Sequence, residues 1–382
     1  MSMKEIELKQ VMISGGGTGG HIFPALSIAN EIHRRYPKCR ILFVGAHGRM
    51  EAERIPEAGY EIMLLPVEGL SRGKNPFKHI RTLWKLLKST RQVRKQIKVM
   101  KPQIAIGVGG YASAPTLIEA AKQGIPTLVQ EQNSYAGKAN KLVGKKAEAI
   151  CVAYKGMERF FTNKKIILTG NPVRSGLLDT SRKLPMAYEY FGFDPKKRTI
   201  LIIGGSLGAR TINNSVINAL NRVVAMENEV QMIWQCGKFY IDDAQRILSE
   251  KGLDGRNILL TDFISHMEYA YSIADLVISR AGASSISELC LLAMPSILVP
   301  SPNVAEDHQT RNAEALVREN AAVMVADKDA DRLLMETALQ LINDDITLKE
   351  LSENVSKLAL PDSAKKIVDE VERIVLEKSL EK

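Results

Sequence analysis

The sequence predicts an α/β protein made of two similar halves, each built on a buried parallel sheet. An apolar, β-branched run that breaks into glycines occurs at residues 11–21 and again at residues 200–210. Such a run is typical of a buried parallel strand that turns tightly into a helix. A second repeated pattern, a glutamate seven residues before a proline, occurs at Glu119 and Glu288. We therefore expect a duplicated domain, with a ligand cleft between the halves.

Each glycine-rich turn has the chemistry of an anion site. Glycines let the backbone approach a phosphate closely, and the N–H groups of the turn can point at it. The N-terminus of the helix that follows adds about half a positive charge. The first turn runs from Gly15 to Gly20 and the second from Gly204 to Gly208. Two such turns predict two phosphorylated ligands.

The first turn also has the G-x-G-x-x-G spacing of dinucleotide-binding sites, with glycines at Gly15, Gly17 and Gly20. That fingerprint requires an acidic residue at the end of the second strand, about 20 residues on. Here the second predicted strand runs into Gly45, and the first acid, Glu51, comes too late. The sequence also lacks the P-loop pattern G-x-x-x-x-G-K-[ST]. Both turns are therefore predicted to bind phosphate in a site that is neither a dinucleotide-binding site nor a P-loop.

Length and composition limit the protein class. The 382 residues suit two domains, each with its own core. The four cysteines are widely spaced without a C-x-x-C pair, which favours reduced thiols over disulfides or metal ligation. No apolar stretch reaches ~18 residues, and no long apolar segment precedes the first glycine turn. We expect a protein that is neither exported nor membrane-spanning.

The positive charge is concentrated in one segment. Residues 69–101 carry eleven Lys or Arg and neither Asp nor Glu, whereas the formal charge of the whole chain is +9. A local basic surface on an otherwise near-neutral protein indicates a polyanionic partner, either nucleic acid or an anionic membrane. Residues 77–100 have a helical pattern, with Pro76 at the start and Pro102 beyond the end.

The apolar residues of this predicted helix form two groups. One face carries Leu86, Val93, Ile97 and Met100, and the other carries Phe77, Ile80, Trp84 and Leu87, with Leu83 between them. One helix cannot bury both faces equally. Either the side chains of Ile80, Leu83, Trp84 and Leu87 insert into an anionic bilayer surface, or this is a core helix whose first turns pack under a loop. Nucleic acid is disfavoured because the segment has only two aromatic residues for base stacking.

Three polar side chains are candidates for catalysis or ligand binding. His21 directly follows the first glycine turn and is either a general base or an ordinary capping or buried histidine. Glu288 either accepts hydrogen bonds from two sugar hydroxyls or favours the dipole of a helix in its first turn. Arg174 either reaches a phosphate or belongs to a solvated linker.

Together these motifs resemble the MurG family of glycosyltransferases along most of the chain. The resemblance rests on residues 16–24, 109–111, 131–133, 170–174, 204–206, 279–283 with Glu288, and 307–313. Family members transfer N-acetylglucosamine from UDP-N-acetylglucosamine to the lipid-linked muramyl-pentapeptide precursor of peptidoglycan. The resemblance implies a GT-B fold, in which two Rossmann-like parallel-sheet domains face a central cleft. It also implies inversion at the anomeric carbon by one in-line displacement, with the acceptor C4 hydroxyl as nucleophile.

The resemblance further implies a domain layout. Residues 1–172 would form an acceptor and membrane-association domain, and residues 173–360 a UDP-sugar donor domain. The amphipathic C-terminal helix, within residues 361–382, is expected to pack back on the first domain.

The family's site residues carry over by position. The implied donor site comprises Thr18, Gly19, Gly20, Asn133, Arg174, Ser206, Ile264, Ala283, Ser284, Ser285, Ile286, Ser287, Glu288 and Gln309. The implied acceptor site comprises Gly16, Gly17, Gly109, Gly110 and Tyr111. His21 is the candidate catalytic base, and Arg174 with the helix N-termini would neutralise the departing UDP. Neither a cofactor nor a metal is expected, because one base and one anion stabiliser suffice.

Two positions depart from the family pattern. Leu207 replaces the glutamine that family members usually carry directly after Gly204-Gly205-Ser206, and Ser285 replaces a threonine but keeps the hydroxyl. The basic helix matches the region of the family's proposed membrane patch, here Ile80, Leu83, Trp84 and Leu87. We therefore expect a peripheral protein on the cytoplasmic face of the cell membrane, with no nucleic-acid partner.

Other functions stay open at this point. A glycolipid glycosyltransferase or a UDP-N-acetylglucosamine epimerase would share the fold and the nucleotide site. A membrane-bound scaffold or a nucleic-acid-binding module would use the basic helix alone and would have no affinity for UDP.

Overall fold

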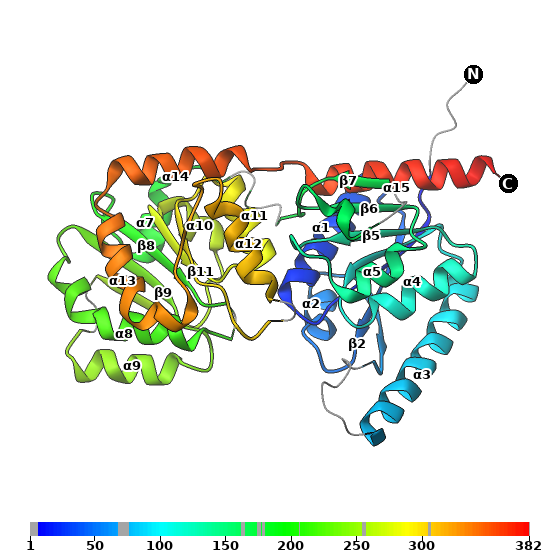
Figure 1. The fold of residues 1–382 in the computed structure, drawn as a ribbon, viewed down its shortest axis with the longest axis horizontal. Coiled ribbons are helices and arrows are strands. Elements are labelled where there is room, and N and C mark those ends of the chain that lie inside the picture. Colours follow the sequence, from blue (N-terminus) through cyan, green and yellow to red (C-terminus); the bar gives the residue numbers. More distant parts are fainter. Residues whose placement is uncertain are drawn as a thin grey trace. The chain divides into compact units, whose positions relative to one another are not determined.

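The computed structural model describes residues 7–67, 76–161, 165–173, 177, 180–205, 207–253, 257–304 and 307–381. The chain divides into two compact units, shown in Figure 1: Met1–Arg174 with Leu360–Lys382, and Ser175–Ala359. Each unit contains one β-sheet whose strands pair in parallel. The prediction of an α/β protein with two parallel-sheet domains is confirmed.

The sheet of the first unit has the strand order β3-β2-β1-β4-β5-β6-β7. Its strands are β1 (Gln10–Gly15), β2 (Arg40–Ala46), β3 (Glu61–Leu65), β4 (Ile104–Gly109), β5 (Thr127–Glu131), β6 (Ala149–Val152) and β7 (Lys165–Leu168). Its helices are α1 (Gly19–Arg35), α2 (Glu51–Glu57), α3 (Pro76–Met100), α4 (Ser113–Lys122), α5 (Lys138–Gly144), the 3₁₀ turn η1 (Met157–Arg159) and α15 (Ser363–Leu380).

The sheet of the second unit has the order β10-β9-β8-β11-β12-β13. Its strands are β8 (Arg198–Ile203), β9 (Val230–Gln235), β10 (Ile258–Thr261), β11 (Leu276–Ser279), β12 (Ser296–Leu298) and β13 (Val323–Met324). Its helices are α7 (Pro185–Phe191), α8 (Arg210–Ala225), α9 (Ile241–Glu250), α10 (Met267–Ile273), α11 (Ala283–Leu291), α12 (His308–Val317), the 3₁₀ turn η3 (Asp327–Asp329), α13 (Ala330–Leu341) and α14 (Asp345–Lys357).

The two sheets share one topology. In each, the chain starts at a central strand, builds outward on one side, and then crosses to the other side. Ligands of such sheets bind beyond the carboxyl ends of the strands at the point where the order reverses. In the first unit this point lies between β1 and β4, which end at Gly15 and Gly109. In the second it lies between β8 and β11, which end at Ile203 and Ser279.

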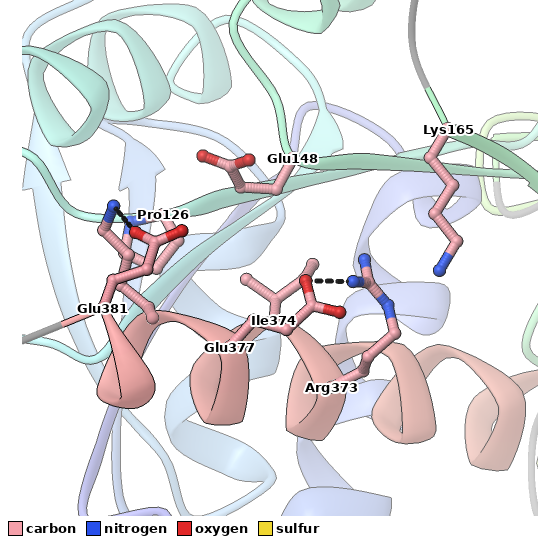
Figure 2. A pocket seen from close by; sticks show the side chains of 8 residues that line it. Pro126, Glu148, Lys165, Arg373, Ile374, Glu377 and Glu381 are labelled. Carbon is pink, nitrogen blue, oxygen red and sulfur yellow. Dashed lines mark hydrogen bonds and ion pairs between the residues drawn. The ribbon is translucent and has the colours of Figure 1, made fainter.

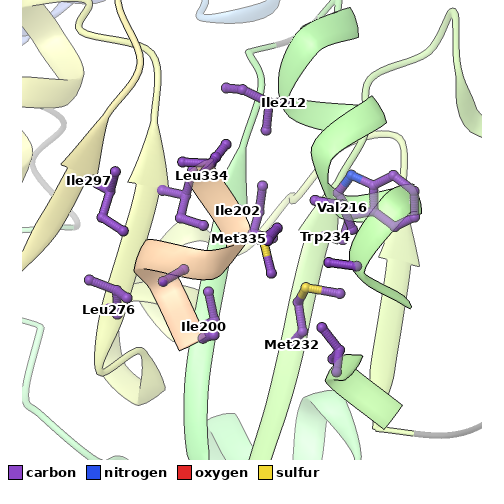
Figure 3. Close-up of a cluster of buried hydrophobic side chains, with 14 of the residues drawn as sticks. Ile200, Ile202, Ile212, Val216, Met232, Trp234, Leu276, Ile297, Leu334 and Met335 are labelled. Atoms are coloured by element: carbon purple, nitrogen blue, oxygen red, sulfur yellow. The ribbon is translucent and has the colours of Figure 1, made fainter. Parts of the chain in front are cut away.

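Alternate residues of each central strand enter different cores. Ile200 and Ile202 of β8 lie in one cluster with Trp234 of β9, covered by α8 and α13 (Figure 3). Leu201, between them, lies in the cluster on the other face, with Tyr271 of α10. Burial on both faces explains why these strands read as continuous apolar runs instead of an alternating pattern.

The last helix belongs to the first unit. α15 packs beside α1, and its apolar side chains Ile367, Val371 and Ile374 are buried in the core of this unit. At the far end of α15 lies a pocket of about 170 Å³ (Figure 2). Its charged lining pairs within itself, as Arg373 does with Glu377. Because its lining residues Pro126, Glu148 and Lys165 lie at the starts of β5, β6 and β7, the pocket is away from the glycine turns at the carboxyl ends of the strands.

An ion-pair network joins α1 to α15. Arg35 donates to Glu31 at 2.7 Å, to Asp369 at 2.6 Å and to Glu372 at 3.0 Å. Hydrogen bonds from Arg34 and Arg35 outweigh burial and lower the pKa of Glu31 from 4.5 to about 2. A depressed folded-state pKa stabilises the fold above the unfolded value, and this contribution is lost as the pH falls through about 2.

We expect Arg35→Ala to lower the free energy of unfolding by about 2 kcal/mol near neutral pH, because it leaves Glu31 and Glu372 without their shared partner. Urea unfolding from pH 7 to pH 2 measures this, and the difference from wild type should shrink below about pH 4.5. Arg34→Ala is the control, since Arg34 is 63% exposed and pairs with Glu31 alone among these residues. Equal losses in both variants would contradict the role of Arg35 in holding α15.

The four cysteines are free and buried. Burial raises the pKa of the thiol to about 11 for Cys39 and Cys236 and to about 12 for Cys290, and it also raises the pKa of Cys151. Since the thiolate is the reactive form, the native protein should react slowly with Ellman's reagent, and all four thiols should react at once in denaturant. A rapid native reaction of any one thiol would show local opening around it.

Candidate active site

The first glycine turn connects β1 to α1. Gly17 has a φ of +90°, a conformation that side-chain-bearing residues rarely adopt. Its N–H donates to Glu51 Oε2 at 2.8 Å, and the other oxygen of Glu51 accepts from the N–H of Ala46 at 3.0 Å. Glu51 is 1% exposed. A carboxylate from the first turn of α2 therefore occupies one N–H group of the predicted anion turn.

His21 lies in the first turn of α1, where its ring contacts Gly109 at the end of β4. Its Nδ1 lies 2.9 Å from the carbonyl oxygen of Gly16. Since a carbonyl can only accept, Nδ1 carries the proton and Nε2 the lone pair of the neutral ring. A Cβ at Gly109 would lie 2.8 Å from Nε2, and a Cβ at Gly110 would lie 2.4 Å from the carbonyl oxygen of Gly16. Only glycines allow this approach of the two loops.

Two further groups flank these loops. Tyr111 is 49% exposed, and the guanidinium of Arg49 lies 5.8 Å from the centre of its ring. Glu131, at the end of β5, accepts from the N–H of Asn133 at 3.0 Å and from Nδ2 of Asn140 at 2.9 Å. One edge of the first sheet thus brings together Gly16, Gly17, His21, Gly109 and Tyr111. At the same edge, Glu131 holds the backbone of Asn133 by a hydrogen bond.

The second glycine turn follows β8. Gly205 and Gly208 both have positive φ, and a Cβ at Gly208 would lie 2.1 Å from the carbonyl oxygen of Cys236. This close approach explains the glycine at 208. Leu207, which replaces the usual glutamine, is 53% exposed. Ser206 lies outside the described residues, as does Arg174.

Helix α11 carries the implied donor residues from Ala283 to Glu288. Glu288 is its sixth residue and is 5% exposed, so the interpretation as a first-turn glutamate that favours the helix dipole is wrong. The hydroxyl of Tyr271 donates to Glu288 Oε2 at 3.0 Å. In the first unit, the matching Glu119 pairs instead with Arg94 of α3 at 2.7 Å. The repeated glutamates therefore have different partners in the two units.

The other implied donor residues differ in exposure. Ser284 Oγ is buried without a hydrogen-bond partner at the start of α11. Ile264 is 4% exposed and packs in the core, whereas its neighbour Phe263 is 45% exposed. Gln309 Oε1 accepts from the N–H of Ser301 at 2.8 Å. The packing of Ile264 and the hydrogen bond of Gln309 hold the turns after β10 and β12 in place near the carboxyl edge of the sheet.

The basic helix is α3. Val93, Ile97 and Met100 are buried, whereas Trp84 is 67% and Leu87 49% exposed. The sequence pattern groups Leu86 with the buried face, but its side chain is 43% exposed. Among the described side chains of α3, the first buried one is Ser89. The side chains of Ile80 and Leu83 lie outside the described ones. Among the described residues, no helix is long and apolar enough to cross a bilayer.

Sequence reasoning assigned no role to Glu51 or Glu131. In the sequence Glu51 comes too late to be the ribose ligand of a dinucleotide site, yet the structure places its carboxylate against the first glycine turn. The glycine at the end of the second strand was the available signal, because a Cβ at Gly45 would lie 2.6 Å from Glu51 Cγ. No local pattern predicts the contact of Tyr271 with Glu288.

Comparison with known proteins finds relatives over most of the chain. Residues 11–152 match the glycosyltransferase family 28 N-terminal domain, and residues 199–367 match the family 28 C-terminal domain. A relative from Parabacteroides distasonis is 56% identical over 366 residues, which cover 96% of this chain and 98% of the relative. It is named UDP-N-acetylglucosamine--N-acetylmuramyl-(pentapeptide) pyrophosphoryl-undecaprenol N-acetylglucosamine transferase.

Solved structures give the same result. The crystal structure of MurG from Acinetobacter baumannii has a TM-score of 0.73 and 28% identity, covering 96% of this chain and 99% of that one. A UDP-N-acetylglucosamine 2-epimerase has a TM-score of 0.66 at 15% identity, covering 96% of both chains, and so shares the fold alone. The chain therefore belongs to the MurG family of glycosyltransferases, within glycosyltransferase family 28.

Proposed function

We propose that the protein transfers N-acetylglucosamine from UDP-N-acetylglucosamine to the C4 hydroxyl of undecaprenyl-diphospho-N-acetylmuramoyl-pentapeptide, which converts lipid I to lipid II in peptidoglycan synthesis. The observation that carries this proposal is the 56% identity over 96% of the chain to a relative named for that reaction. Both glycosyltransferase family 28 domains are present, in the expected order.

His21 is the proposed base on the acceptor side. In the displacement, the C4 oxygen forms a bond to C1 of the sugar while the bond from C1 to the UDP oxygen breaks. The C4 hydroxyl proton passes to Nε2, which carries the lone pair because Nδ1 donates to the carbonyl of Gly16. The turns at Gly16 and Gly109 are the proposed site of the acceptor diphosphate, with Tyr111 at their rim.

The second unit is the proposed donor side. The turn at Gly204 and the N-terminus of α8 supply N–H groups and positive potential for the diphosphate of UDP. Ser206 and Arg174, outside the described residues, are proposed to add to this stabilisation. Glu288 is proposed to accept from the ribose hydroxyls, with Tyr271 fixing one of its oxygens. Residues Thr18 to Gly20, Asn133, Ile264, Ala283 to Ser287 and Gln309 complete the proposed donor contacts.

Release of UDP from UDP-N-acetylglucosamine, with and without lipid-linked muramyl-pentapeptide in detergent, tests this function. We expect release that depends on the acceptor and survives a chelator. Product analysis should find a β-linked disaccharide on the lipid, as inversion requires. Release that is independent of this acceptor would instead favour an epimerase or a glycolipid transferase.

The exposed side chains of α3 support a peripheral membrane location. Trp84 and Leu87 project beside lysines at 85 and 88, which suits the interface of an anionic bilayer. We propose that this patch, with Ile80 and Leu83, docks the protein on the cytoplasmic face of the membrane, where a lipid-linked acceptor resides. Through its product the protein would serve wall growth, cell shape and division.

The membrane patch makes a direct prediction. The double change Trp84→Glu and Leu87→Glu should reduce binding to phosphatidylglycerol vesicles about tenfold or more, because it removes two apolar anchors and adds negative charge. Co-sedimentation with vesicles measures this at two salt concentrations. Val99→Glu is the control, because Val99 is 69% exposed at the other end of the same helix. Unchanged binding of the double variant would exclude this face of α3 as the contact.

A further inference from the structure

One buried carboxylate and one histidine hold opposite ends of the same peptide group. The carbonyl of Gly16 and the N–H of Gly17 belong to one planar peptide. His21 Nδ1 lies 2.9 Å from that carbonyl oxygen, and Glu51 Oε2 accepts from that N–H at 2.8 Å. The chain of contacts therefore runs from Glu51 through the peptide to the imidazole of His21.

Glu51 is buried between two glycines whose positions leave room for its side chain. Its second oxygen accepts from the N–H of Ala46 at 3.0 Å, at the end of β2. A Cβ at Gly16 would lie 2.2 Å from Glu51 Oε1, and a Cβ at Gly45 would lie 2.6 Å from its Cγ. The side chain is 1% exposed, and the ion pairs between described residues do not include it. Its charge is thus compensated by backbone N–H groups and by the N-terminus of α2.

The orientation of this peptide decides which nitrogen of His21 can accept a proton. Gly17 has a φ of +90°, and glycine allows both signs of φ, so the peptide before it can flip without a side-chain clash. A flipped peptide would present its N–H to Nδ1 and would favour the tautomer with the proton on Nε2. In that tautomer Nε2 cannot take a proton from the acceptor.

We propose that Glu51 is a positioning residue that locks the Gly16–Gly17 peptide and thereby keeps the lone pair of His21 on Nε2. This inference rests on the proposed function of His21 as the base. Glu51 is buried, and its carboxylate is bonded to backbone N–H groups, so we assign it no direct contact with either substrate. It acts through the peptide, so its removal should change the rate of the chemical step and leave donor binding intact.

The test compares Glu51→Gln with wild type. Glutamine has nearly the same shape, but its amide NH₂ must face one of the two N–H donors, so one hydrogen bond is lost. We expect kcat to fall about 10- to 100-fold, as small misplacements of catalytic groups cause. The affinity for UDP, measured by calorimetry, should stay within about twofold of wild type, because the donor residues of the second unit are untouched. Glu53→Gln, an exposed glutamate on the same helix, is the matched control with wild-type kcat.

A spectroscopic readout separates positioning from folding. In protein labelled with ¹⁵N-histidine, the His21 signals are assigned by their loss in His21→Ala. At a pH where the ring is neutral, wild type should show the proton on Nδ1, and Glu51→Gln should show a shift toward Nε2. This measurement needs no substrate, so it still tests the inference if wild type fails to transfer sugar to the muramyl lipid.

A second variant guards against misfolding of the first. Gly45→Ala keeps the charge of Glu51 but presses on its Cγ from β2, and it should lower kcat in the same direction. The inference is overturned if folded Glu51→Gln or Gly45→Ala keeps wild-type kcat and an unchanged His21 tautomer. It is also overturned if UDP affinity and melting temperature fall in parallel with kcat, since that is the signature of a merely structural role.

Discussion

Replacement of His21 by alanine is expected to lower kcat by about 10²- to 10⁴-fold, the usual contribution of a positioned general base. The affinity for UDP-N-acetylglucosamine should be unchanged, because His21 contacts Gly16 and Gly109 of the first unit and the proposed donor site lies mainly in the second. Steady-state UDP release gives kcat, and calorimetry with UDP gives the affinity.

Two further variants make the result specific. His21→Asn keeps a donor for the carbonyl of Gly16 but has no basic nitrogen, so its kcat should be as low as that of the alanine variant. His33→Ala, an exposed histidine on the same helix α1, should have wild-type kcat. Substantial activity of His21→Asn would mean that His21 shapes the loop without taking the proton.

Replacement of Glu288 by alanine is expected to weaken UDP binding by about 100-fold, because hydrogen bonds to a charged acceptor contribute roughly 1.5–3 kcal/mol each. Glu288 is 5% exposed and bonded to Tyr271, so the carboxylate is already oriented before the ligand arrives. Tyr271→Phe removes only that orienting bond and should weaken binding by less. Calorimetry with UDP measures both variants.

The duplicated fold supplies the control for this experiment. Glu119 has the same place relative to Pro126 as Glu288 has to Pro295, but its carboxylate pairs with Arg94. Glu119→Ala should lower stability and leave the UDP affinity as in wild type. A loss of UDP affinity in both variants would mean that the effect of Glu288→Ala comes from unfolding and not from a lost ligand contact.

Much of the fold was predictable because its signals are local. An apolar run that ends in glycines indicates a buried strand and a tight turn wherever it occurs, and its repetition predicts two similar sheets. The exposure of Trp84 and Leu87 agrees with the second apolar face of the basic helix. The exposure of Leu86 was not predictable, because the angle of a residue on a helix does not say where the neighbouring core ends.

The sequence by itself determined the two-sheet class, the positions of the glycine turns and the family to which they belong. Only the tertiary structure decided which groups meet there. Glu51 reaches the first glycine turn from the start of α2, Gly109 lies against His21, and the equivalent glutamates at 119 and 288 take different partners. The physical reason is that glycine turns and strand patterns depend on neighbours in the chain. Hydrogen-bond partners of buried side chains depend instead on contacts made when distant strands align in one sheet.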